Sequence, residues 1–252
     1  MPEPRSPVQS VDRALEILDY LARHGEAGVT DLAAHLGVHK STAFRLLAAL
    51  EAHGLVEQPG VRYRLGVGLM RLAAAVPEQR DLTGACRRVG EELADECGET
   101  VNVAVAHGGA AVNVDQVHGG GSALVSHNWI GERTPLHATS SGKVLLAYGV
   151  APPPEHLEAL TPATVTDPAA LAAQLAEVRR TGLAVAVDEL EPGLTATAAP
   201  VRGHDGRVVA AISVSGPSFR LEGAKLVAAG KAVVRAADEA SRRLGWRPAA
   251  QT

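Results

Sequence analysis

The sequence has few aromatic residues, few cysteines and no long apolar run. Aromatic side chains make up 3% of the 252 residues, and there are two cysteines, Cys86 and Cys97. Two cysteines cannot build a disulfide framework or a four-thiolate metal site, so we expect free thiols in a reducing compartment. No stretch approaches the ~18 apolar residues of a membrane-spanning helix, and residues 1–10 lack the apolar core of a secretion signal. We therefore expect a cytoplasmic protein with no membrane partner.

An excess of positive charge is also missing. The formal net charge is −4, and residues 1–77 hold eight Lys or Arg against eight Asp or Glu. Non-specific binding to nucleic acid depends on many cationic contacts with phosphates, so this composition excludes a protein coated in basic surface. Any contact with DNA must come from a local cluster of cations.

The chain does contain enough apolar residues, 46% of the total, to build real cores. Its length allows one large domain or two ordinary ones. Residues 11–23, 30–37 and 39–54 repeat apolar positions at helical spacing. Residues 55–66 follow as two strand-forming segments around Pro-Gly, and residues 67–76 are helical again. The sequence therefore predicts three helices, a hairpin and a linking helix in its first third.

A short helix, a glycine turn and a longer helix form the helix-turn-helix pattern, in which the second helix enters the DNA major groove. In residues 39–54, Leu46, Leu47 and Leu50 supply a buried face and leave the polar first turn free. Arg45 is suited to a guanine edge or a phosphate. Two arginines occupy alternate positions on the hairpin and so point to the same side, which suits a wing along the DNA backbone. They contribute a charge of +2, in addition to the charge of +2 on residues 38–45. The candidate DNA-binding residues are Lys40, Ser41, Thr42, Arg45, Arg62 and Arg64.

Two alternatives stand beside this interpretation. The segment also fits an ordinary three-helix bundle with arginines on its surface. Phe44 lies in the middle of the longer helix, and we favour packing in the core or at its edge. If Phe44 is exposed instead, its ring is suited to the methyl group of a thymine.

The remaining two thirds of the chain mix helices with antiparallel-type strands, which predicts an α+β domain. The expected helices are residues 82–97, 140–149, 152–160, 167–182 and 226–244. The expected strands are residues 101–107, 111–118, 123–128, 183–187, 195–201 and 208–215.

Several segments, in order, resemble the IclR family of bacterial regulators from Val11 to Leu244. They include SVDRALEILDYLARHG, HLGVHKSTAFRLLAALEAHGLVE, TPLHATSSGKVLLAY, ELEPG and AAPVRGHDGRVVAAISVSGPSFRL. The resemblance implies a winged helix-turn-helix, a GAF-like effector-binding domain, and homodimers or homotetramers on palindromic operators. We therefore expect a flexible arm at 1–9, the winged helix-turn-helix at 10–66, a linker helix at 67–80, the GAF-like domain at 81–246 and a tail at 247–252.

The resemblance also implies where a small-molecule effector binds. Ser213 and Ser215 alternate on one strand and so face the same way. Asn128 and Trp129, next to one matching segment, offer a donor and a flat wall. The candidate effector-binding residues are Ser126, Asn128, Trp129, Ser140, Ser141, Asp188, Glu189, Ala196, Ser213 and Ser215. The alternative for the serines is that they cap helices and strand ends.

The chain departs from its relatives at two of the matching positions. Relatives often have cysteine at Ala196 and aspartate at Ala186, and these residues contact small 2-oxo acids in some members. Their absence argues against an effector like glyoxylate or pyruvate. A site of hydroxyls favours a ligand with many polar groups, because each buried polar group left unpaired costs ~1–3 kcal/mol. A ureido acid or purine-breakdown product such as allantoin or allantoate fits best, followed by an aromatic acid or an antibiotic-pathway metabolite.

The sequence gives no support to a catalytic, metal or cofactor site. Residues 140–143 match Ser-x-x-Lys, but the KTG and SDN signatures of penicillin-recognising enzymes are absent. His118, His127 and His137 are not spaced as ligands on one helix or strand. The leading prediction is a ligand-responsive repressor. An activator of the same fold, an enzyme with a fused DNA-binding domain and an interaction module with a vestigial pocket are the alternatives.

Overall fold

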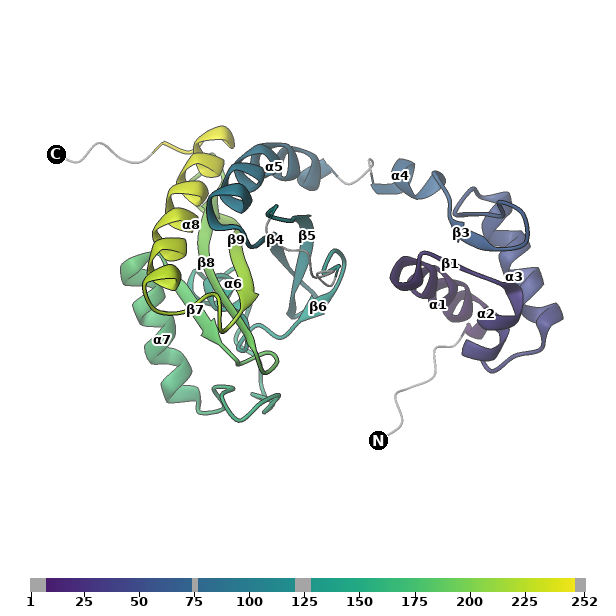
Figure 1. Cartoon of the computed structure of the whole chain (residues 1–252), viewed down its shortest axis with the longest axis horizontal. Coiled ribbons are helices and arrows are strands. Elements are labelled where there is room, and N and C mark those ends of the chain that lie inside the picture. The colour runs from purple at the N-terminus through teal and green to yellow at the C-terminus, as the bar shows by residue number, and fades with distance from the viewer. Residues whose placement is uncertain (1–7, 74–76, 121–127, 248–252) are drawn as a thin grey trace. The chain divides into compact units, whose positions relative to one another are not determined.

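The computed structural model describes residues 8–73, 77–120 and 128–247, with the backbone alone for 77–81. Ser126 and most of the strand expected at 123–128 therefore lie outside the described residues. The chain divides into two compact units, Met1–Pro77 and Glu78–Thr252 (Figure 1). Both units combine helices with antiparallel strands, so the fold is α+β, as the sequence predicts. Among the described helices, none is long and apolar enough to cross a membrane.

The first unit is a helix-turn-helix with a three-stranded antiparallel sheet of order β1-β3-β2. Its elements are α1 (Gln9–His24), β1 (Glu26–Ala27), α2 (Val29–His35), α3 (Lys40–Ala52), β2 (Val56–Glu57), β3 (Tyr63–Leu65) and α4 (Gly68–Ala73). Ile17 and Leu21 of α1 pack with Leu32 of α2, Leu47 of α3 and Tyr63 of β3 in one buried core. This core fixes α2 against α3 and leaves the start of α3 outside it.

Glycines set the turn that follows α3. Gly54 adopts a φ of +70°, which a residue with a side chain rarely takes, so it ends the helix. A Cβ on Gly68 would lie 2.6 Å from the carbonyl oxygen of Gly54. Gly54 precedes β2 and Gly68 follows β3, so this close approach holds the two ends of the hairpin together.

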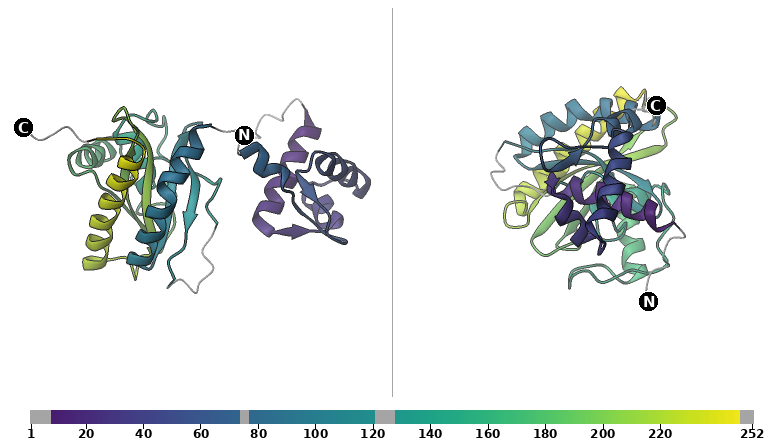
Figure 2. Two further views of the ribbon diagram at one scale, coloured as in Figure 1. Left: turned by 90° about the horizontal axis from the view of Figure 1, so that it is seen from above. Right: turned by 90° about the vertical axis from the view of Figure 1, so that its right-hand side faces the viewer.

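The second unit is built on a six-stranded antiparallel sheet of order β6-β5-β4-β9-β8-β7. Its strands are β4 (Thr100–His107), β5 (Ala110–Val117), β6 (Arg133–Thr134), β7 (Ala184–Val187), β8 (Leu194–Arg202) and β9 (Val208–Pro217). Its helices are α5 (Pro77–Cys97), α6 (Ser140–Ala147), α7 (Pro168–Thr181) and α8 (Gly223–Arg243). Helices α5 and α8 lie side by side, joined by an ion pair between Glu96 and Arg235 (Figure 2).

Strand alternation divides the residues of this sheet between two cores. Val101, Val103, Ile212 and Val214 pack in the core that α5 and α8 cover. The residues between them in β4 and β9 take the opposite face, where α6 packs. Polar side chains on that second face are therefore held beneath α6.

Some expected elements differ from the structure. Residues 152–160 form no helix, and three successive prolines at their start supply no N–H groups for one. The short strand β6 was not predicted, because two residues carry no periodic signal. The prediction of a helix at 167–182 is confirmed in α7: Asp167 caps its start and Gly182 ends it with a φ of +71°.

The two cysteines of the chain are free. Cys86 is buried in α5, and burial raises the pKa of its thiol to about 12, with a further contribution from Asp115. Burial also raises the pKa of Cys97. Both thiols therefore remain protonated and unreactive at neutral pH.

Candidate functional site

Helix α3 exposes the polar residues that the sequence selects for DNA contact. Ala43, Leu47 and Leu50 are buried, whereas Lys40, Ser41 and Arg45 are exposed and Thr42 is half-buried. His39 precedes the helix in an extended conformation, and its Nδ1 lies 3.2 Å from the Ser41 hydroxyl. The first turn of α3 therefore offers a cation, a hydroxyl and the free N–H groups of a helix start.

Phe44 is 55% exposed, so the prediction that it packs in the core or at its edge is wrong. The buried face of α3 is filled by Ala43 and Leu47, which leaves Phe44 on the outward side next to Arg45. An exposed aromatic ring beside candidate DNA contacts fits the alternative, contact with a thymine methyl.

Arg62 and Arg64 are exposed on the hairpin, but each is paired with a glutamate. Arg62 Nε lies 2.9 Å from Glu26 Oε1, and Arg64 Nε lies 2.5 Å from Glu57 Oε1. Glu26 and Glu57 stand opposite Arg64 on the two strands beside β3, so the four charges share one side of the small sheet. The expected +2 of the wing is therefore balanced locally, because cross-strand partners supply two negative charges.

The second unit has a cavity of about 50 Å³ on the face of the sheet beneath α6. Six of the predicted effector-binding residues line it: Trp129, Ser140, Ser141, Ala196, Ser213 and Ser215. The residues that sequence reasoning missed are Asn102, Asn113, Thr134, Thr139, Leu190 and Leu194. Among the described lining residues none is charged, so the cavity offers hydroxyls, amides and apolar walls.

Asn102 contributes a buried amide to this cavity. It lies on β4 opposite Ser213 of β9, and its Nδ2 donates to Ser215 Oγ at 3.1 Å. Asn102 is 5% exposed, and its Oδ1 is buried without a hydrogen-bond partner. A buried acceptor without a donor is costly, so this oxygen is a natural contact for an N–H or O–H group of a ligand.

The start of α6 forms another wall of the cavity. Thr139, not a serine, caps the helix: its Oγ1 accepts from the Gly142 N–H at 3.1 Å. Ser140 and Ser141 are the first two helical residues, and a helix start leaves their N–H groups without intrahelical partners. Together with the helix dipole, these groups favour an anionic ligand atom.

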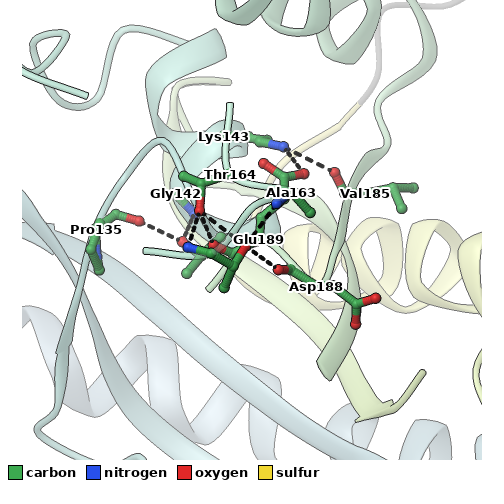
Figure 3. Close-up of polar contacts among 10 residues, drawn as sticks. Pro135, Gly142, Lys143, Ala163, Thr164, Val185, Asp188 and Glu189 are labelled. Atoms are coloured by element: carbon green, nitrogen blue, oxygen red, sulfur yellow. Dashed lines mark hydrogen bonds and ion pairs between the residues drawn. The ribbon is translucent and has the colours of Figure 1, made fainter. Parts of the chain in front are cut away.

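Asp188 and Glu189 do not line the cavity, contrary to their predicted role. Asp188 has a φ of +56°, and its Oδ1 accepts from the Gly193 N–H and the Ser218 hydroxyl. Glu189 Oε1 accepts from Lys143 Nζ (Figure 3). Both carboxylates are therefore used to hold the turn after β7, and it is Leu190 of this turn and Leu194 at the start of β8 that reach the cavity.

Two threonines complete the support of this turn. Thr161 Oγ1 donates to the Asp188 carbonyl at 2.6 Å, and Thr164 Oγ1 donates to the Glu189 carbonyl at 2.7 Å. Figure 3 labels Thr164, Asp188 and Glu189 beside Lys143. Burial lowers the pKa of Lys143, while the hydrogen bond that Lys143 donates to Glu189 opposes that shift.

Asn128 also differs from its predicted role. It is exposed, its Oδ1 accepts from the Ile130 N–H at 3.1 Å, and it does not line the cavity. Its neighbour Trp129 does line it, with its backbone N–H donated to Gln116 Oε1.

Comparison with known proteins identifies both domains. Residues 10–60 match the IclR helix-turn-helix domain, and residues 74–242 match the bacterial transcriptional regulator IclR C-terminal domain. The chain belongs to the IclR family. It is similar to the HTH-type transcriptional regulator XynR of Escherichia coli K12, with 34% identity over 248 residues, 95% of this chain and 98% of the relative. It is also similar to the HTH-type transcriptional repressor AllR of Klebsiella pneumoniae, with 33% identity over 261 residues, 99% of this chain and 94% of the relative.

An IclR homolog from Microbacterium hydrocarbonoxydans, solved in complex with 4-hydroxybenzoate, has the same fold. Its TM-score is 0.77 at 27% identity, covering 95% of this chain and 99% of that one. The named relatives are regulators and not enzymes. This IclR-family chain is therefore a transcriptional regulator with a DNA-binding domain and an effector-binding domain.

Some of the missed cavity residues of this IclR-family chain carry a sequence signal and others do not. In β4 and β5, Asn102 and Asn113 each stand between valines, and alternate side chains of a strand point to opposite faces of the sheet. If the valines face one core, both asparagines face the other side, where α6 packs. Leu194 begins β8 and alternates with Ala196, so it too carries a signal. Thr134 and Leu190 come from a two-residue strand and a turn, where no periodicity applies.

Proposed function

We propose that this protein is a repressor that leaves a palindromic operator when a small polar metabolite fills the cavity beneath α6. It would act in the cytoplasm as a homodimer or homotetramer, because a palindrome is read by two related helix-turn-helix heads. Similarity to the Klebsiella repressor supports the direction of the response. The single observation that carries the proposal is the uncharged, hydroxyl-rich cavity with the unpaired Oδ1 of Asn102.

The cavity chemistry defines the ligand. Asn102 Oδ1 requires a donor, and the N–H groups at the start of α6 favour a carboxylate. A ureido acid such as allantoate has both, with N–H groups at one end and a carboxylate at the other. The hydroxyls of Ser213 and Ser215 then bond to the polar groups between them.

The small volume explains how such a ligand would be sensed. About 50 Å³ holds a few waters and not a metabolite. We propose that binding displaces a wall, either the start of α6 or the segment that carries Leu190 and Leu194. A ligand that binds only the displaced arrangement shifts the population toward it, and this is the differential affinity that a switch requires.

On the DNA side, we propose that Lys40, Ser41, Thr42 and Arg45 enter the major groove while Arg62 and Arg64 follow the backbone. A gel-shift assay with the DNA upstream of the protein's own gene tests this. We expect Arg45→Ala to lose specific binding, because a guanidinium contact to guanine is worth ~1–3 kcal/mol. Arg23→Ala, an exposed arginine of α1, is the matched control. Full binding by the Arg45 variant would remove it from the interface.

The effector proposal is tested by adding allantoate to the preformed complex. Wild type should release the operator, and Asn102→Ala should bind the operator normally but need at least tenfold more allantoate. A wild type that ignores allantoate and related ureido acids would overturn the ligand class, while the Arg45 experiment would still test DNA binding. A reporter fused to the operator in a deletion strain distinguishes repression from activation.

A second ligand class rests on one further observation. Trp129 lines the cavity, and a structural relative binds 4-hydroxybenzoate. An aromatic acid would stack its ring on Trp129 and place its carboxylate at the start of α6. Release of the operator by 4-hydroxybenzoate, with no response to ureido acids, would favour this class.

A further inference from the structure

A second and larger hollow, of about 340 Å³, lies elsewhere in the same unit. It is formed where β8 extends past its neighbour: β7 pairs with Thr195–Ala198 only, and Ala199–Arg202 continue along β9. Helix α8 borders the hollow, together with Tyr148 just after α6 and the end of α7 at Thr181 and Gly182. None of the residues that line it also lines the cavity beneath α6.

An arginine is held in this hollow by two aromatic rings. The guanidinium of Arg202 lies 4.9 Å from the centre of the Tyr148 ring and 5.7 Å from that of Trp246. Its Nη1 donates to the Gly206 carbonyl at 3.0 Å, and its backbone N–H donates to the Ser241 hydroxyl. Within the described part of the chain no carboxylate forms an ion pair with this guanidinium. The guanidinium of Arg202 is therefore held in place and keeps N–H donors that no described carboxylate accepts. Two such donors match the two oxygens of a ligand carboxylate.

A negative group faces the same hollow. Asp238 of α8 is exposed and forms no ion pair with any described residue, Arg202 included. The last turn of α7 also ends here, at Gly182, and helix C-termini carry partial negative charge on their free carbonyls. Both features favour a cation. The hollow thus holds opposite charges that do not neutralise each other.

Between the charged groups the lining is apolar. Pro200 of β8 and Val234 of α8 supply part of it. The volume falls within the range of small-molecule sites, ~300–1,000 Å³. A ligand that satisfies the whole hollow needs an anionic end, a cationic end and an apolar part.

We propose that this hollow binds a free amino acid. The carboxylate bonds to Arg202, the ammonium group lies between Asp238 and the end of α7, and an apolar side chain packs against Pro200 and Val234. Because α8 borders this hollow and also packs across the sheet whose other face carries the cavity beneath α6, an amino acid would provide a second signal to the regulator.

The experiment uses the full chain and the twenty proteinogenic amino acids as probes, by thermal shift and then calorimetric titration. We expect at least one amino acid to raise the melting temperature, by mass action on the folded state. Its N-acetyl derivative, which lacks the ammonium group, and its amide, which lacks the carboxylate, should bind at least tenfold more weakly.

Variants locate the site. Asp238→Asn should weaken binding at least tenfold without changing the melting temperature of the free protein, because Asp238 is exposed and unpaired. Asp95→Asn, an exposed aspartate of α5, is the matched control, and Asn102→Ala should bind the amino acid normally. Arg202→Lys should also weaken binding, although Arg202 also holds Trp246 in place. The proposal is overturned if no amino acid binds, if Asp238→Asn and Arg202→Lys bind as wild type, or if Asn102→Ala is the variant that loses binding.

Discussion

Lys143 Nζ lies 2.5 Å from Glu189 Oε1, and the two side chains are 1% and 8% exposed. Lys143 belongs to the helix whose start lines the cavity beneath α6, and Glu189 belongs to the turn that supplies Leu190 to the same cavity. This buried ion pair therefore ties two walls of the cavity to each other (Figure 3). Any displacement of one wall by a ligand must move or break it.

Removing one partner of this pair should destabilise the second unit strongly. Lys143→Met or Glu189→Gln leaves a buried charge without its counter-ion, at a cost of ~3–5 kcal/mol. The double variant Lys143→Met/Glu189→Met should recover most of that loss. Urea unfolding measures the free energy of unfolding of each variant. Arg235→Met is the control, because the exposed Arg235–Glu96 pair should contribute less than ~1 kcal/mol. Equal losses in the single and double variants would contradict this account.

The same lysine should make stability depend on pH. Burial lowers the pKa of Lys143 below its ordinary value of 10.5. Between the lowered pKa and 10.5, the unfolded chain holds a proton that the folded chain does not, so the free energy of unfolding should rise with pH in that window. Urea midpoints measured up to pH 10.5 test this. The rise should be smaller in Lys143→Met than in wild type, and identical pH profiles would exclude Lys143 as its source.

The wing glutamates should restrain DNA binding. Glu26→Gln/Glu57→Gln frees Arg62 and Arg64 and removes two negative charges from the same side of the hairpin. We expect tighter binding to non-specific DNA and a steeper dependence of log K on log salt, by up to ~0.9 per freed arginine. Fluorescence anisotropy at several salt concentrations measures both. Glu16→Gln/Asp19→Asn, at two exposed acids of α1, controls for the change of +2 in net charge. A slope no steeper than that of this control would show that the wing does not contact phosphates.

Phe44 should contribute to DNA recognition and not to folding. Phe44→Ala removes an exposed ring, so the free energy of unfolding should change by less than ~0.5 kcal/mol. Operator affinity should fall by ~1–3 kcal/mol, as for the loss of one base contact. Operators with uracil in place of single thymines identify the methyl group: wild type should lose affinity at that position and the variant should not. If every uracil operator weakens both proteins equally, Phe44 touches no methyl group.

Two glycines should respond oppositely to alanine. A Cβ on Gly142 would lie 2.3 Å from the Leu136 carbonyl oxygen, so Gly142→Ala must push α6 away from that segment, at ~1–3 kcal/mol. Gly84 in α5 has open space around its Cβ position, so Gly84→Ala should stabilise by ~0.5–1 kcal/mol through helix propensity. Thermal melts of the two variants measure the contrast. A stable Gly142→Ala protein would mean that α6 tolerates displacement.

Much of this arrangement can be predicted from single elements. The helical repeat of residues 39–54 identifies the recognition helix, and period-two alternation places Ser213 and Ser215 on one face of β9. These predictions succeed because the direction of a side chain within a helix or strand depends only on local geometry.

What the sequence by itself determined was which elements form and which face each side chain takes within them. Only the tertiary structure decided which faces meet. It set Glu26 against Arg62, 36 residues away, and it turned Asp188 and Glu189 toward internal partners while Asn102 entered the cavity. The physical reason is that strand order and helix packing bring together residues distant in the chain, and hydrogen bonds and charges are satisfied only after that packing exists.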